Sequence, residues 1–258
     1  MRSDTVPPQR LVWTPELVNR FWDVVGTTAL EAHAFARIAG RLFIIAARAH
    51  LTPGGRHLDF GAGDGTLTRL MIEAGFPTAA FEPAPERRHA LERALGGLPG
   101  FLGAAAGTDA PYDAVVMAEV IEHVIDEELD PVLRAVHGFL RPGGRLIIST
   151  PHAEDLEASM VYCPVSNLLF HRWQHVRSLT PESLAGLLAP HGFRVIVTHL
   201  VEFSNFGFLL PPERMRVPAP LAALWRRVRT AQLAHRFRSG RQVTLGDRSH
   251  MLCVAERI

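Results

Sequence analysis

The feature that most constrains the fold is a glycine-rich turn at residues 61–65. Residues 56–60 predict a short strand, and residues 66–74 have the apolar spacing of a helix. Glycine lets a backbone turn sharply and approach a bound ligand closely. In an open parallel sheet, ligands bind beyond the carboxyl ends of the strands. We therefore expect a ligand site at this turn, formed by Asp59, Gly61, Ala62, Gly63, Asp64 and Gly65.

Strand and helix patterns alternate along the rest of the chain. Residues 112–118 contain the apolar run of a buried strand, and Arg-Pro-Gly-Gly at 141–144 ends the helix that follows. Alternating strands and helices indicate an α/β fold with a doubly wound, mostly parallel sheet. The expected strands are 56–60, 78–81, 101–102, 112–118, 145–150, 193–201 and 250–256, and the expected helices are 66–74, 85–95, 129–140 and 180–191.

The N-terminal residues predict a helical cap ahead of this sheet. Residues 1–13 suggest a flexible lead, whereas Thr14, Pro15 and Glu16 have the pattern of an N-cap, a first helical position and an acidic first turn. We expect one helix from there to about residue 25 and a second at 29–50. The predicted domains are a cap at 1–53 and a ligand-binding domain at 54–258.

Composition excludes several classes of protein. The formal net charge is +1, so the chain as a whole is no obvious polyanion binder. Its two cysteines, Cys163 and Cys253, do not imply a disulfide framework. Residues 1–10 lack the apolar core of a signal peptide, and the most apolar helical stretch, 42–51, is too short and too charged to span a membrane. We expect a cytoplasmic protein.

An acidic residue ends the second predicted strand. Glu82 lies 21 residues after Gly61, and in this topology such an acid accepts hydrogen bonds from ribose hydroxyls. A nicotinamide cofactor is one alternative, but its Gly-x-Gly-x-x-Gly fingerprint places the third glycine one residue later than Gly65. Asp59 and Asp64 would also repel a pyrophosphate, whereas they would attract the ammonium and sulfonium groups of S-adenosylmethionine. Charge therefore favours S-adenosylmethionine.

Four motifs in order resemble those of the class I (Rossmann-like) S-adenosylmethionine-dependent methyltransferases. The resemblance covers about residues 54–200 and the final strand. It implies a seven-stranded sheet whose last strand is antiparallel, with a helical insertion before that strand. It also implies cofactor contacts by Pro83, Ala118 and Glu119, in addition to the glycine turn and Glu82. The four motifs are residues 57–65, Glu82, residues 112–119 and Leu-Arg-Pro-Gly-Gly at 140–144.

The sequence departs from this family after the third strand. The family often has an acidic residue there, close to the adenine. This chain has Gly-Ala-Ala-Ala-Gly at 103–107, and Asp109 is the nearest candidate. The adenine contacts are therefore the least defined part of the expected site.

Glu119, Glu122 and His123 follow the fourth strand. If they open a helix, they share one face, and such a set could bind a divalent metal ion that lowers the pKa of a substrate hydroxyl. One alternative is that His123 acts alone as a general base. Another is that Glu119 borders the cofactor while Glu122 and His123 make structural hydrogen bonds. The motif resembles most closely the ubiquinone-biosynthesis O-methyltransferases. It also resembles small-RNA 3′-end 2′-O-methyltransferases, in which a second histidine completes the metal site, at a spacing like that of His175.

This resemblance implies catalytic roles for Glu122, His123 and His175. It also implies a candidate metal site made by Glu119, Glu122, His123 and His175. Because a Glu-His pair after the fourth strand occurs in metal-free members as well, the metal-free alternative stays open.

Two further segments are expected to cover the site as lids, 151–179 and 202–249. Trp22, in the first helix, is a candidate neighbour of the site. Within the second lid, residues 221–238 combine several arginines with an apolar helical repeat. Such a basic amphipathic helix contacts an anionic membrane or an anionic substrate, or packs on its own domain. The repeat is Leu221, Leu224, Trp225, Val228 and Ala231.

These observations together favour an S-adenosylmethionine-dependent methyltransferase that acts on an oxygen of a small molecule or glycoconjugate. One alternative is a metal-dependent RNA 2′-O-methyltransferase, which requires a basic, aromatic-lined groove. A second is a module that binds S-adenosylmethionine without catalysis. Nucleic acid is not the favoured partner, and the sequence indicates neither the acceptor atom nor the oligomeric state.

Overall fold

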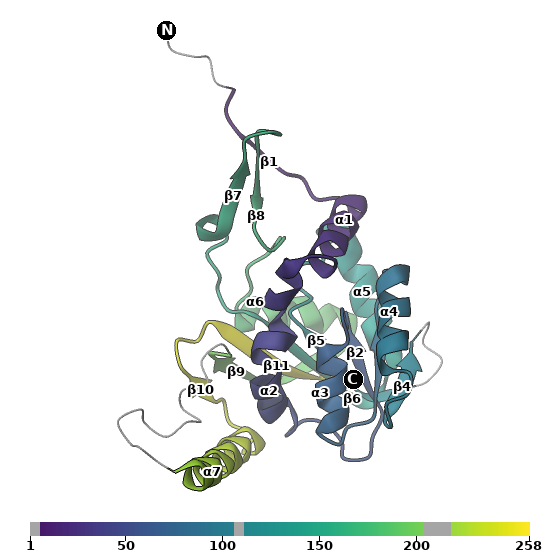
Figure 1. Ribbon diagram of the computed structural model, residues 1–258, viewed down its shortest axis with the longest axis vertical. Coiled ribbons are helices and arrows are strands. Elements are labelled where there is room, and N and C mark those ends of the chain that lie inside the picture. Colours follow the sequence, from purple (N-terminus) through teal and green to yellow (C-terminus); the bar gives the residue numbers. More distant parts are fainter. Residues whose placement is uncertain (1–5, 106–110, 204–217) are drawn as a thin grey trace.

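The computed structural model describes residues 6–105, 111–203 and 218–258. They form an α/β fold in which helices flank a large, mostly parallel sheet (Figure 1). The strand order is β10-β9-β11-β6-β5-β2-β3-β4, and only the two pairs made by β11 are antiparallel. The strands are β2 (His57–Phe60), β3 (Thr78–Phe81), β4 (Phe101–Ala104), β5 (Tyr112–Ala118), β6 (Leu140–Pro151), β9 (Phe193–Val201), β10 (Thr244–Leu245) and β11 (His250–Arg257).

The parallel sheet with an antiparallel last strand confirms the predicted fold class. The described residues give this sheet eight strands, because the two-residue β10 pairs with the edge strand β9. A second, three-stranded sheet was not predicted and stands apart from the first in Figure 1. The prediction of a flexible lead was wrong at residues 9–10, because these residues form a strand. That strand pairs with a hairpin of the first lid segment, 151–179. The small sheet contains β1 (Gln9–Arg10), β7 (Met160–Cys163) and β8 (Leu168–His171).

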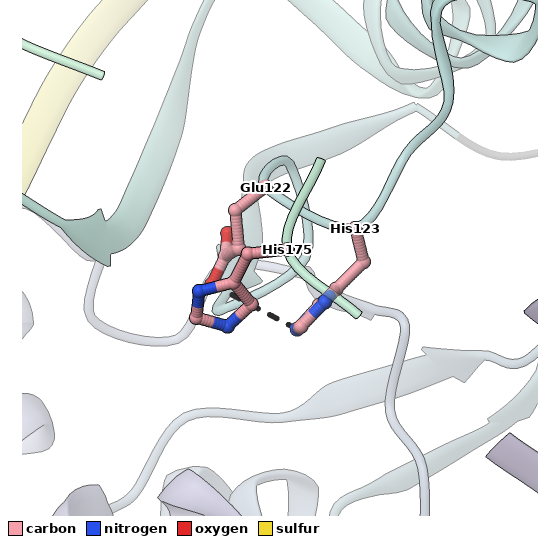
Figure 2. Close-up of side chains that lie close together, drawn as sticks. All are labelled: Glu122, His123 and His175. Atoms are coloured by element: carbon pink, nitrogen blue, oxygen red, sulfur yellow. Dashed lines mark ion pairs between the residues drawn. The ribbon is translucent and has the colours of Figure 1, made fainter. Parts of the chain in front are cut away.

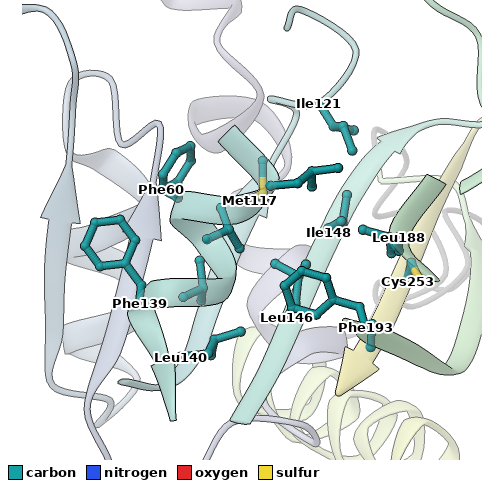
Figure 3. Packing of buried hydrophobic residues seen from close by; sticks show 14 of the residues in the cluster. Phe60, Met117, Ile121, Phe139, Leu140, Leu146, Ile148, Leu188, Phe193 and Cys253 are labelled. Atoms are coloured by element: carbon teal, nitrogen blue, oxygen red, sulfur yellow. The ribbon is translucent and has the colours of Figure 1, made fainter. Parts of the chain in front are cut away.

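The central strands are buried on both faces, and their side chains alternate between two cores. In β5, Ala114 and Val116 point to one core, while Val115 and Met117 point to the other, which is shown in part in Figure 3. The first core is covered by α2 (Phe35–Ala47), α3 (Thr66–Glu73) and α7 (Ala219–Arg238). The second core is covered by α5 (Asp126–Phe139) and α6 (Pro181–Leu188). A small third cluster packs beneath α4 (Pro85–Leu95).

The N-terminal helices follow the prediction at their start and depart from it in the middle. Helix α1 (Pro15–Gly26) begins as expected, because Thr14 Oγ1 accepts a hydrogen bond from the Leu17 N–H at 3.4 Å. The single helix predicted at 29–50 was wrong, since the extended Ala34 divides it into a 3-10 turn (Ala29–His33) and α2. Helix α2 packs into the first core, and the domain boundary at residue 53 stays a prediction.

Two further short 3-10 turns lie at Glu157–Ser159 and Ala189–His191. Across the described ranges, no helix combines the length and the apolar character needed to cross a membrane. The carboxyl ends of β2, β3, β5 and β6 lie along one edge of the sheet, because these four strands are parallel neighbours. This edge is where the topology places a ligand.

Candidate active site

The glycine turn ties three strand ends together. Gly61 has φ +79°, and its N–H donates a hydrogen bond to the carbonyl oxygen of Phe81 at 2.9 Å. A Cβ atom at this position would lie 2.7 Å from Cγ2 of Val120, which follows β5. Both the left-handed conformation and the close approach require glycine. The ends of β2, β3 and β5 therefore meet at this residue.

Hydrogen bonds orient the two aspartates of the turn. Buried Asp59 accepts a hydrogen bond from Thr68 Oγ1 at 2.7 Å, and its burial raises its pKa to about 7. Asp64 accepts a bond from the Thr66 N–H at 2.9 Å, and Arg37 of α2 pairs with its carboxylate at 2.7 Å. These contacts fix both acids beside the turn. A buried carboxyl such as Asp59 would ionise more readily beside a bound cation.

Glu82 lies at the end of β3, where the sequence predicts a ribose-binding acid. Its Oε2 accepts a hydrogen bond from the Gly63 N–H at 3.0 Å, and its Oε1 accepts one from the Ala84 N–H at 3.1 Å. Burial raises the pKa of this carboxyl, and the Arg87 guanidinium at 3.8 Å opposes that rise. A carboxylate oxygen accepts more than one hydrogen bond, so both atoms keep capacity for a hydroxyl. Pro83, the next residue, is exposed.

A cavity of about 620 Å³ opens over this edge of the sheet. Its described lining includes five carboxylates and a single arginine, Arg87, a balance that suits a cationic ligand and disfavours a polyphosphate. Gly65, Glu82, Pro83 and Glu122 are not among the lining residues. The predicted site residues that line the cavity are Asp59, Gly61, Ala62, Gly63, Asp64, Ala118, Glu119, His123 and His175.

The segment after β5 forms a turn, so Glu119, Glu122 and His123 do not share the face of a helix. Glu119 has φ +54°, and its N–H donates to the Ser149 carbonyl oxygen at 2.9 Å. The lid segment 151–179 supplies hydrogen bonds in place of those that a helix would form within itself. It supplies three donors to consecutive carbonyl oxygens of this turn: Arg177 Nη1 to Ile121 at 2.7 Å, the Val176 N–H to Glu122 at 2.9 Å and Gln174 Nε2 to His123 at 2.9 Å.

This turn nevertheless brings Glu122, His123 and His175 together, as Figure 2 shows. One possible ligand atom from each lies within 4.8 Å of the others, and His123 Nε2 is 3.9 Å from Glu122 Oε1. Glu119 does not belong to this group, because its Oε2 faces His250 Nε2 at 3.6 Å. The structure thus groups three of the four residues proposed to bind a metal.

The group is buried and short of hydrogen bonds. Glu122 is 1% exposed, and neither of its carboxylate oxygens has a hydrogen-bond partner among the described residues, nor does His123 Nδ1. Burial raises the pKa of Glu122 well above its usual value, and the neighbouring Glu119 adds to the rise. Burial lowers the pKa of His123 well below its usual value. Unpartnered buried groups of this kind are stabilised by a proton or a cation.

Glu154 and His171 lie beside Glu122, His123 and His175, and we call these five residues the cluster. The sequence prediction did not include Glu154 or His171 as site residues. Glu154 Oε2 lies 2.5 Å from His175 Nδ1, while its Oε1 lies 3.3 Å from His171 Nε2. His171 Nδ1 accepts hydrogen bonds from the N–H groups of Trp173 and His175, so a neutral His171 bears its proton on Nε2. This tautomer makes His171 a hydrogen-bond donor and removes it as a metal ligand.

Burial acts to raise the pKa of Glu154, but the hydrogen bond with His175 and the nearby histidines lower it below its ordinary value. An ionised Glu154 holds the proton of His175 on Nδ1 and leaves the Nε2 lone pair free. The signal available in the sequence was weak, because Glu154 is one acid among the residues of a lid.

Trp22 connects helix α1 to the cluster. Its indole Nε1 donates to Gln174 Oε1 at 2.9 Å, and its ring lies 4.7 Å from the His123 ring, centroid to centroid. Gln174 is fully buried and has φ +63°, so its backbone is held in an uncommon conformation. Trp22 lines the cavity, as expected, whereas the bridging role of Gln174 was not foreseen.

A model of the methyltransferase domain matches residues 30–198. This chain belongs to that family. The ubiquinone biosynthesis O-methyltransferase of Xanthomonas campestris pv. campestris (strain B100) is 37% identical over 142 residues, covering 52% of this chain and 57% of that protein. Its namesake from Xanthomonas oryzae pv. oryzae (strain PXO99A) is 35% identical over the same length. The chain thus matches little more than half the length of these curated relatives.

Solved structures show the same Rossmann-like methyltransferase fold. A 1,6-didemethyltoxoflavin-N1-methyltransferase from Burkholderia thailandensis aligns with a TM-score of 0.57 at 18% identity, covering 98% of this chain and 94% of its own. A glycopeptide N-methyltransferase complexed with S-adenosylhomocysteine aligns with a TM-score of 0.55 at 18% identity, covering 96% and 99%. Identity at this level shows the fold, and the chemistry must come from the site.

Proposed function

We propose that this chain binds S-adenosylmethionine at the glycine turn and transfers the methyl group to an oxygen of a small molecule or glycoconjugate. One observation carries the proposal: a single cavity joins the acidic glycine turn to His123 and His175 of the buried cluster. Membership of the methyltransferase family and the O-methyltransferase relatives support it.

The residues of the cavity suit this cofactor. The turn presents Asp59 and Asp64 to a cation, and the backbone of Gly61 allows close approach. Glu82 lies outside the cavity lining, at the end of β3, and would accept bonds from ribose hydroxyls beside Gly63. Buried Oε1 of Glu119 has no partner among the described residues and can accept an N–H. The cofactor supplies an electrophilic methyl group on a sulfonium, which is transferred by direct displacement. The protein therefore contributes alignment and charge placement.

His175 is the residue best placed to take the acceptor's proton. With Glu154 on Nδ1, the Nε2 lone pair remains available, and the residue lines the cavity. A hydroxyl that loses its proton to Nε2 becomes a stronger nucleophile. His123 packs 4.8 Å from the His175 ring, and its low pKa keeps it uncharged near neutral pH.

A divalent metal ion is a second candidate cofactor at the same cluster. The observation that favours it is the pair of unpartnered Glu122 oxygens, one of which lies 3.9 Å from His123 Nε2. Glu122, His123 and His175 would be the ligands, and Glu154 would orient His175 from behind, as carboxylates do for metal-bound histidines. Such an ion would lower the pKa of an acceptor hydroxyl.

The cavity wall indicates the acceptor class. Trp22, Phe35, Trp173 and Phe203 supply aromatic surface, which suits a ring-containing hydroxyl compound. The single arginine of the described lining does not provide the basic groove that an RNA backbone requires. We therefore place small hydroxylated acceptors ahead of RNA.

The test is methyl transfer from radiolabelled S-adenosylmethionine to a panel of catechols, phenols, aminoglycosides and short RNAs, with and without EDTA. We expect transfer to a phenolic or sugar hydroxyl, and a loss of about 100-fold in kcat for His175→Asn. His235→Asn, on the exposed side of α7, is the matched control and should retain full activity. Loss of activity with EDTA supports the metal, whereas cofactor binding without transfer to any acceptor would leave only the non-catalytic module.

A further inference from the structure

Helix α7 is attached to the domain by only part of its length. Leu233, Ala234 and Phe237, near its C-terminal end, are buried against the first core, where α7 packs on α2. Toward the N-terminal end, four large apolar side chains are exposed to solvent. They are Leu221 (55% exposed), Leu224 (56%), Trp225 (37%) and Val228 (47%).

These exposed side chains lie on the side of the helix opposite to its packing face. Val228 precedes the buried Phe237 by nine residues, and nine steps of about 100° place the two on opposite sides of a helix. Leu221, Leu224 and Trp225 fall within about 60° of Val228 by the same count. The row therefore faces away from the side of α7 that packs on the domain. Figure 1 shows α7 at the margin of the molecule, away from the small sheet.

Positive charge borders this apolar row. Residues 219–246 contain six arginines and no acidic residue, although the whole chain has a net charge of only +1. Arg227 and Arg229 lie about 100° to either side of Val228. The Arg229 guanidinium lies 5.7 Å from the centre of the Trp225 ring. An outward apolar row with arginines on both flanks, one of them against a tryptophan, is the pattern of helices that lie in a membrane interface.

We propose that the outer face of α7, defined by Leu221, Leu224, Trp225 and Val228 and flanked by Arg227 and Arg229, binds the surface of an anionic lipid bilayer. The apolar row enters the acyl boundary, and the arginines contact lipid phosphates. A second copy of the chain fits less well, because a two-fold contact would bring the arginines of two helices together. A nucleic acid would satisfy the arginines but leave the apolar row in water.

The packing of α7 on its own domain also sets how the helix lies on the membrane. Because the buried face stays on its own domain, the helix lies parallel to the bilayer surface and does not cross it. The domain is then held at the membrane by one edge. This inference is independent of the proposed methyl transfer, since it uses no residue of the cavity.

Vesicle flotation of the full chain tests the proposal. We expect binding to vesicles of phosphatidylcholine with about 30% phosphatidylglycerol, at least tenfold weaker binding to phosphatidylcholine alone, and loss of most binding near 0.5 M NaCl. Leu224→Glu/Val228→Glu should bind at least tenfold more weakly. Leu102→Glu/Ile258→Glu, which changes two other exposed apolar side chains, is the matched control and should bind as the unmodified chain does.

A second readout locates the contact. Lipids brominated near the headgroup should quench tryptophan fluorescence, and Trp225→Phe should remove most of that quenching while folding is unaffected at this exposed site. Absence of binding to anionic vesicles would overturn the proposal. So would equal loss in the control variant, or a dimer in solution that Leu224→Glu/Val228→Glu dissociates.

Discussion

Gly61→Ala is the substitution whose effect the structure defines most sharply. A left-handed conformation costs alanine about 1–2 kcal/mol, and Gly61 has φ +79°. The new Cβ would also lie 2.7 Å from Val120 Cγ2, and overpacking of this kind costs about 1–3 kcal/mol. We expect the free energy of unfolding to fall by about 2–5 kcal/mol, the sum of these two effects.

Gly54→Ala separates the two contributions. Gly54 has φ +70°, but a Cβ there meets no heavy atom within 4 Å, so only the conformational cost of about 1–2 kcal/mol should remain. Urea unfolding of both variants measures the difference. Adding Val120→Ala to Gly61→Ala should recover much of the excess, because it removes the atoms that the new Cβ would contact. Equal destabilisation by Gly61→Ala and Gly54→Ala, with no recovery in the double variant, would refute the close approach of the turn to Val120.

Three further predictions concern Glu154 of the cluster, the buried acid Asp59 and the turn after β5. Glu154→Gln should lower kcat about tenfold, because an amide no longer fixes the orientation of His175 and the position of its proton. A kcat equal to that of the unmodified chain would contradict this role. Asp59 has a pKa raised to about 7 from an ordinary 3.8, so its native form retains a proton that the unfolded chain releases. Its contribution to stability should therefore decline as the pH rises from about 4 to about 7, and the unfolding free energy of Asp59→Asn, measured beside that of the unmodified chain, should lack this decline. Arg177→Ala should destabilise the chain by about 1–3 kcal/mol, since Ile121 loses a charged donor to its carbonyl oxygen, and thermal unfolding would detect it as a lowered Tm.

The sequence predicts the parts of this protein that depend on short stretches of chain. The Gly61 turn, the buried strand β5 and the Thr14 N-cap each depend on residues close in sequence, and the structure has all three. Glu82 was found because the spacing from the turn is fixed by one strand–helix–strand unit.

The parts that were missed depend on distant contacts. The turn after β5 could not be predicted from its own residues, because the donors that replace its helical bonds come from Gln174, Val176 and Arg177, more than 50 residues later. Glu154 was missed for the same reason, since only the folded lid places it against His175. Asp109, named for the adenine, lies outside the described residues.

The acidic glycine turn is the proposed binding site of S-adenosylmethionine. Titration calorimetry with S-adenosylhomocysteine tests it most directly, with Glu82→Ala and the control Glu157→Ala, whose carboxylate pairs with Arg10 at the surface. We expect one bound molecule per chain, at least tenfold weaker binding by Glu82→Ala, and unchanged binding by Glu157→Ala. Absence of binding by the unmodified chain, or equal affinity in all three proteins, would contradict the proposed site.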